Sequence, residues 1–190
     1  MLRRKGFTLV EILFVLIIAA GIVMFAVPAY KRSKVRARYE AATGILMSAG
    51  NAYNNLKQDF ENNSHSCAFP LHTYELPAQN ASGMHAGMDE TAEDFICGAS
   101  SASERETRVM SVLYDKKYLD PFVNRSEYRY YVMQTGSMPT TICRGKCSGV
   151  VCMCLPDDKA SDPDYACFYG ASFSSDGRVR RIVSNSCPNS

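Results

Sequence analysis

Residues 7–30 read FTLVEILFVLIIAAGIVMFAVPAY, a run of 24 residues with one charged side chain, Glu11. A helix rises 1.5 Å per residue, so this run spans about 36 Å, more than the roughly 30 Å of a bilayer's hydrocarbon core. Basic residues lie on both sides of it. They are Arg3, Arg4, Lys5, Lys31, Arg32, Lys34, Arg36 and Arg38. The stretch predicts a helix that inserts in a membrane near the start of the chain.

The carboxylate of Glu11 separates the candidate types of membrane segment. An ordinary secretory signal has its cleavage site after a short apolar core, whereas here only MLRRKG precedes the apolar run. A plain signal anchor fits the length but gives Glu11 no role. A carboxylate within an apolar helix costs a few kcal/mol to insert, so its presence indicates a functional site.

The leader ends at Gly6 and is followed directly by FTLVE and the apolar run. This arrangement resembles the class III signal of type IV prepilins and type II secretion pseudopilins, over roughly residues 1–60. The matching residues are Gly6, Phe7, Thr8, Leu9, Val10, Glu11 and Pro28. The resemblance implies that prepilin peptidase cleaves between Gly6 and Phe7 and methylates the new amine of Phe7. The mature chain would then hold 184 of the 190 residues.

Cleavage would create a cationic amine four residues before Glu11. In a low-dielectric bundle, pairing an amine with a carboxylate offsets much of the burial cost of both groups. If the Phe7 amine belongs to an incoming subunit and Glu11 to its neighbour, the pair sets the axial stagger of a filament. The alternatives for Glu11 are a pair within one chain or a side chain that reaches the membrane surface.

Gly21 and Pro28 weaken this helix, because proline removes a backbone hydrogen bond and clashes with the preceding turn. The simpler interpretation is a gentle kink, which membrane helices tolerate. The resemblance implies instead a stretch that bends or locally unwinds when it packs into a filament.

Apolar residues continue beyond the membrane run at alternating steps of four and three, which predicts a stripe on one face of a helix. The stripe consists of Val35, Tyr39, Ala42, Leu46, Ala49, Tyr53, Leu56 and Phe60. We therefore expect one helix of roughly 80 Å that ends near Asn62-Asn63-Ser64. The predicted organisation is a leader (1–6), a membrane and assembly helix (7–30) and an exported domain (31–190) that includes the helix to about 62.

The remaining sequence predicts a small sheet. Residues 64–105 lack periodicity and are expected to form a long loop, and residues 104–119 a short helix with Val109, Val112 and Leu113 on one face. Strands are expected at 127–134, 149–155, 166–174 and 178–183, and Asp176-Gly177 favours a hairpin between the last two. The fold class predicted is α+β: a long helix packed on an antiparallel sheet, with a disulfide-stapled C-terminal region.

All eight cysteines follow the first third of the chain, as expected of an exported domain that meets an oxidising compartment. They are Cys67, Cys97, Cys143, Cys147, Cys152, Cys154, Cys167 and Cys187. Zinc ligation by the four between 143 and 154 is disfavoured because they lack paired knuckles. In a strand, Cys152 and Cys154 point to one face and require two different partners. Cys67 and Cys97 can tie the long loop, and by the resemblance Cys167 pairs with Cys187, as is common in pilins.

The other chemical candidates are weaker. Major pseudopilins bind calcium in a C-terminal loop, and a loop here holds Asp157, Asp158, Asp162 and Asp164; the favoured interpretation is a solvated acidic turn. The histidines 65, 72 and 85 form no recognisable site, and Asn62, Asn80 and Asn124 begin weak glycosylation sequons. No phosphate-binding loop, zincin helix or nucleophile elbow is present. We expect no enzyme activity and no cofactor.

Charge argues against a nucleic-acid partner. Residues 1–38 hold eight basic residues and one acidic residue, which leaves 13 basic and 18 acidic residues in 39–190, a net charge of −5. The resemblance implies other pilin subunits, prepilin peptidase and an inner-membrane assembly platform as partners. It also implies that the chain lies in the bacterial inner membrane before assembly and in a cell-surface or periplasmic filament afterwards. The alternatives are a type II secretion pseudopilin, a competence pilin and a signal-anchored binding domain that does not polymerise; an anchored enzyme is disfavoured.

Overall fold

The computed structural model describes residues 9–62, 67, 69, 74–76, 96–101, 104, 108–109, 112–113, 127–132, 143–183 and 187. Gly6 and Phe7 of the predicted cleavage site lie outside the described residues, as do the histidines 65, 72 and 85 and the sequons at Asn80 and Asn124.

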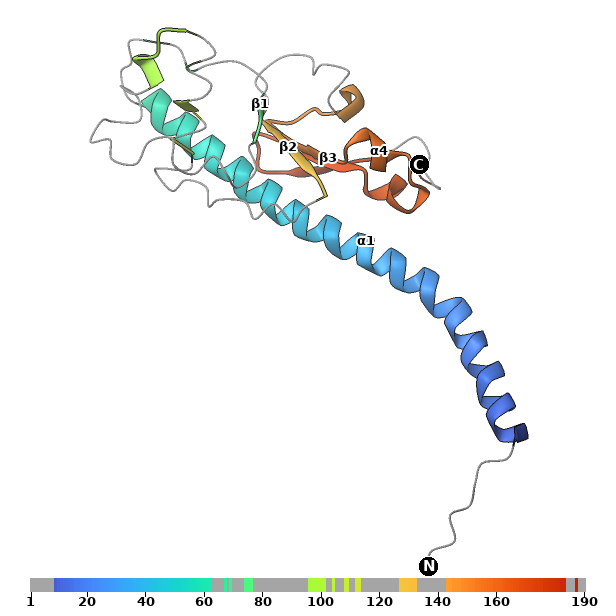
Figure 1. Ribbon diagram of the computed structural model, residues 1–190. Helices are drawn as coiled ribbons and strands as arrows, with labels where there is room; N and C mark the ends of the chain where they lie inside the picture. Colours follow the sequence, from blue (N-terminus) through green and yellow to red (C-terminus); the bar gives the residue numbers. More distant parts are fainter. Residues whose placement is uncertain are drawn as a thin grey trace, which may run out of the picture.

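One helix dominates the molecule. Helix α1 runs over Leu9–Asn62, 54 residues, which at 1.5 Å per residue is about 80 Å. It continues without interruption through Gly21 and Pro28, and Figure 1 shows its first half as a smooth curve that leads away from the rest of the chain. The prediction of a single long helix is confirmed, and no local unwinding is present in this state.

The second half of α1 packs on the rest of the chain through the predicted stripe. All eight stripe positions are buried, together with Gly50 and Ala52 on the same side. Leu46, Tyr53 and Leu56 are each at most 1% exposed. Steps of three and four residues keep these side chains on one face, so the helix presents a continuous apolar surface to the sheet.

The sheet has five strands in the order β1-β2-β3-β4-β5, and every pair is antiparallel. The strands are β1 (Tyr74–Glu75), β2 (Arg129–Val132), β3 (Val151–Cys154), β4 (Gly170–Phe173) and β5 (Val179–Ile182). A long apolar helix on a small antiparallel sheet confirms the α+β layout. Figure 1 shows the sheet lying along the distal half of α1.

One expectation about the segments between α1 and β2 is corrected, and one is confirmed over the described residues. The segment 64–105 is not wholly loop, because Tyr74 and Glu75 pair with β2 and because Phe69, Leu76 and Ile96 are buried. Within 104–119, Glu104, Arg108–Val109 and Val112–Leu113 are helical, and the valines and Leu113 are buried as predicted.

The expected strand at 166–174 is wrong in its first half. Residues Pro163–Phe168 form a 3-10 helix, η3, and β4 begins only at Gly170. The Asp162 side chain accepts a hydrogen bond from the backbone N–H of Asp164 (2.9 Å), and Pro163 occupies the first helical position. Both features start a helical turn. The hairpin predicted after β4 is confirmed: the chain turns at Gly177, whose φ is 78°.

All four residues of strand β3 are buried. Val151 pairs with Phe173 on the face that meets α1, so Cys152 and Cys154 lie on the opposite face. There they form disulfides with Cys147 and Cys143. The disulfide-linked segment that precedes β3 thus helps to cover the outer face, which explains why a short central strand is buried on both sides.

The eight cysteines form four disulfides, and none is free. The pairs are Cys67–Cys97, Cys143–Cys154, Cys147–Cys152 and Cys167–Cys187. Separate partners for Cys152 and Cys154 are confirmed, as is the tie between Cys67 and Cys97. The metal-ligand interpretation of the cluster is wrong, because its thiols are consumed in pairs.

The disulfides differ in the length of chain that they close, and this difference predicts an order of stability. Cys67–Cys97 spans 30 residues and Cys147–Cys152 spans five. In the chain-entropy model, the paired change Cys67→Ser/Cys97→Ser is expected to lower the free energy of unfolding by about 1.5 kcal/mol more than Cys147→Ser/Cys152→Ser. Urea unfolding of the detergent-solubilised chain measures both; equal losses would contradict the entropic account.

Candidate functional site: the projecting half of α1

The first half of α1 carries a large apolar surface that the rest of the described chain does not cover. Every residue from 9 to 34 is exposed. Leu9 is 81% exposed, Phe25 79% and Met24 75%. The most apolar 18-residue window of this helix has a mean hydropathy of 2.9 and no buried residue.

An apolar surface of this extent favours a covering partner. A soluble monomer rarely exposes more than a few hundred Å² of contiguous apolar surface, and burial of that surface is favourable by about 25 cal/mol per Å². Among the described residues, α1 is the one helix whose length and composition allow it to cross a membrane. Lipid and the corresponding helices of other copies are the two environments that suit it.

Glu11 is the single acidic side chain on this surface, in the first turn of α1. The positive end of the helix dipole stabilises a carboxylate in that turn. Glu11 therefore places one carboxylate near the N-terminal end of the apolar segment. The proposed partner, the amine of Phe7, lies outside the described residues, so the pairing stays a prediction.

A polar cluster around Arg38, the last of the flanking basic residues, fixes α1 to the head. The head is the second half of α1 together with the sheet, α4 and η3. Arg38 pairs with Glu127, and the Tyr165 hydroxyl donates a hydrogen bond to Glu127 Oε2 (2.6 Å). Lys159 Nζ lies 3.7 Å from the same carboxylate. Arg38 and Glu127 are 89 residues apart in the chain. The cluster therefore joins α1 to η3 and to the residues just before β2, and it fixes the direction of the projecting helix.

Buried tyrosines extend this junction. The Tyr39 hydroxyl donates to the Gly170 carbonyl and the Tyr130 hydroxyl to the Ala42 carbonyl, both at 3.3 Å. The centroid of the Tyr39 ring lies 5.3 Å from the centroid of the Phe168 ring. Burial raises the pKa of Tyr39 and of Tyr128, so both hydroxyls stay neutral donors well above neutral pH.

The electrostatics of Glu127 favour its charged form. Partial burial opposes ionisation, but the Tyr165 hydrogen bond and the charges of Arg38 and Lys159 outweigh it, so the pKa of Glu127 lies below its ordinary value of 4.5. A depressed carboxyl pKa contributes stability that is fully present above the unfolded-state pKa. That contribution is lost as pH falls through the lower pKa of the folded state.

Glu127→Gln is therefore expected to lower the free energy of unfolding by about 1–2 kcal/mol at neutral pH, as for hydrogen bonds to a charged group. The difference from the wild-type chain should shrink as pH falls through the lowered pKa of Glu127, because the wild-type carboxyl then becomes neutral too. Glu61→Gln is the matched control: its pair with Lys57 (3.6 Å) is exposed and should be worth no more than about 0.5 kcal/mol. Equal losses in both variants, or a loss independent of pH, would contradict this role for Glu127.

The acidic segment does not gather into a cation site. Asp157 and Asp158 open a one-turn helix, α4 (Asp157–Ala160), and Asp162 caps η3. Arg144 Nε lies 3.6 Å from Asp157 Oδ1. In the part of the chain that the structure describes, no three histidine, cysteine or acidic side chains are placed to hold a metal ion. The calcium candidate thus has no support in this geometry.

Sequence reasoning identified the projecting surface but missed the Arg38–Glu127 cluster. No local pattern reveals it, because its members come from α1, from the residues just before β2, from α4 and from η3. Comparison of the chain with family models, with curated proteins and with solved structures gave no match.

Proposed function

We propose that the chain is a structural subunit of a type IV pilus-like filament, made as a prepilin and polymerised through the first half of α1. One observation carries the proposal: a single helix exposes an apolar surface on all sides over residues 9–30, whereas its second half buries one face against the rest of the chain. In the membrane, lipid covers the exposed half before assembly. In the filament, the same half packs against its counterparts in other copies.

Glu11 favours polymerisation over simple anchoring. A helix that only anchors a domain gains nothing from a carboxylate in its apolar segment and bears its insertion cost. In a helical bundle, the carboxylate can pair with the amine that cleavage after Gly6 would create at Phe7. The junction around Arg38 and Glu127 supports the same proposal, since a rigid link between helix and head lets the filament core set the position of each head.

A pseudopilin of type II secretion is the second candidate, since it uses the same leader and helix. The two differ in where the polymer is found. A pilus subunit is recovered from sheared cell surfaces, whereas a pseudopilin stays with the cell envelope.

The test is to shear the source cells, purify any filaments and solve their structure by cryo-electron microscopy. The proposal predicts a helical core built of residues 7–30 with the disulfide-bonded heads outside. Cells that lack prepilin peptidase are the control and should yield none. A chain that stays monomeric in the membrane, in cells that do make filaments, would overturn the proposal and favour a signal-anchored binding domain.

A further inference from the structure

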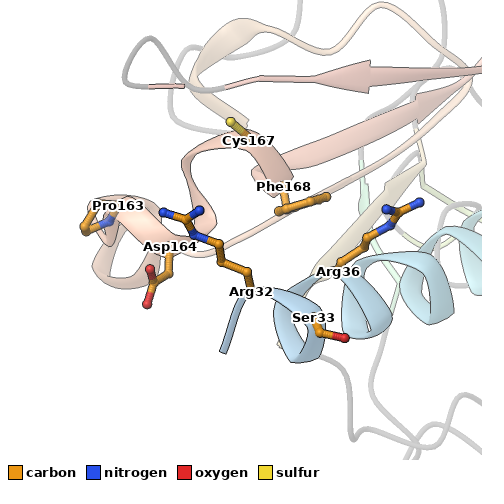
Figure 2. Close-up of a pocket in the computed structure, with 7 residues that line it drawn as sticks. All are labelled: Arg32, Ser33, Arg36, Pro163, Asp164, Cys167 and Phe168. Atoms are coloured by element: carbon orange, nitrogen blue, oxygen red, sulfur yellow. The ribbon is translucent and has the colours of Figure 1, made fainter. Parts of the chain in front are cut away.

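A pocket of about 800 Å³ lies at the neck, where the projecting half of α1 meets the head. Figure 2 shows its lining: basic and polar side chains from α1 on one side and η3 on the other. The residues are Arg32, Ser33, Arg36, Pro163, Asp164, Cys167 and Phe168. Its volume is in the range of about 300–1,000 Å³ that holds small-molecule ligands.

The pocket is electropositive on its helix side. Within the described part of the chain, Arg32 makes no hydrogen bond or ion pair, and Figure 2 shows its guanidinium extending toward η3. Arg36 is engaged by Glu40 through Nε (2.8 Å) on an exposed face. The one acid in the lining, Asp164, has its carboxylate turned away from the Arg32 guanidinium (Figure 2). An anion can therefore approach Arg32.

Phe168 gives the lining an aromatic surface, and one cation lies over its ring. The guanidinium carbon of Arg181 lies 5.7 Å from the centroid of the Phe168 ring. Arg181 thus adds a positive charge near the Phe168 ring, although it does not line the pocket. A guanidinium suits a phosphate, and an apolar wall suits the carbon atoms attached to it.

The position of the pocket along α1 identifies the source of the phosphate. Arg32 follows the last residue of the apolar run, Tyr30, by two positions, or about 3 Å along the helix. If residues 7–30 span the membrane, the pocket lies at the level of the lipid headgroups. Phe25 lies two turns before Arg32 on the same face of α1, is 79% exposed and offers a contact for an acyl chain. We propose that the neck pocket binds the headgroup phosphate of an anionic phospholipid. This proposal rests on the proposed membrane insertion.

The bound lipid would act before assembly. It would hold the neck at the membrane surface, with the head at a fixed height and the apolar helix fully immersed. Packing into a filament removes the helix from lipid, so the headgroup must leave the pocket as the subunit is extracted.

The experiment uses the full chain in phosphatidylcholine nanodiscs that contain phosphatidylglycerol, with retained lipid counted by native mass spectrometry. The wild-type chain is expected to retain one phosphatidylglycerol. Arg32→Gln should retain it about tenfold less tightly than Lys34→Gln, because it loses charge-assisted hydrogen bonds as well as a share of the general attraction. Lys34→Gln is the matched control: it removes one charge from the same turn of α1, but Lys34 does not line the pocket.

The other outcomes overturn the proposal in distinguishable ways. Equal losses in Arg32→Gln and Lys34→Gln would mean diffuse attraction between a basic segment and an anionic surface. Displacement of the lipid by excess inorganic phosphate would mean a site for free anions. If the chain inserts but retains no phosphatidylglycerol, the pocket proposal fails and membrane insertion stands. A chain that does not enter nanodiscs would remove the basis of both proposals.

Discussion

Replacement of Glu11 by leucine is expected to remove the chain from filaments while leaving it folded and inserted in the membrane. Leucine makes the segment more apolar, so insertion should be undiminished. In the assembled core, however, the Phe7 amine of the adjoining subunit would lose its counter-charge. Leaving one partner of a buried ion pair alone costs about 3 kcal/mol or more, so the amount of chain in sheared filaments should fall at least about tenfold.

Glu61→Leu is the control for this experiment, because it makes the same change in the same helix at an exposed position within the head. It should assemble at the wild-type level. Quantitative immunoblotting of the sheared and membrane fractions measures both variants. If E11L enters filaments as well as the wild-type chain, Glu11 has no role in assembly.

The second large effect is expected at Gly50, where α1 meets the sheet. A Cβ atom at this position would overlap the ring of Phe173, which is 1% exposed. Neither partner can move easily, because the helix backbone and a buried ring form the contact. Gly50→Ala is therefore expected to lower the free energy of unfolding by at least about 2 kcal/mol, despite alanine's better helix propensity.

Gly44 provides the matched control six residues earlier in α1. It is exposed, and a Cβ there meets nothing within 4 Å. Gly44→Ala should raise the free energy of unfolding by about 0.5–1 kcal/mol, through helix propensity alone. Urea unfolding of the full chain in detergent, followed by circular dichroism, measures the two variants. The same sign of change in both would contradict the close helix–sheet contact.

Local pattern was sufficient for the long helix and for its buried face. The steps of three and four from Val35 to Phe60 are a property of the helix itself, so the sequence alone reveals them. The Asp176-Gly177 turn is equally local. The projecting surface could be predicted for the same reason, since an apolar run with one acid needs no tertiary information.

Features that depend on distant partners could not be predicted. Strand β1 is two residues long, and only its pairing with Val132 and Tyr131 defines it. The sequence of β3 does not show that the strand is buried on both faces. Nothing in the local pattern reveals that the disulfides to Cys143 and Cys147 bring the preceding segment over its outer face. The neck pocket forms only because the fold places η3 beside α1. The Arg38–Glu127 pair joins residues that are 89 positions apart in the chain.

The central claim is that the chain is a processed prepilin, and the mass of its N-terminal peptide tests this most directly. The protein is purified from its native membrane or from sheared cell surfaces, in cells with an active prepilin peptidase. The account predicts a chain of 184 residues that begins at N-methylated Phe7. A chain that still begins at Met1 would contradict it and leave a membrane-anchored, disulfide-bonded domain that does not polymerise.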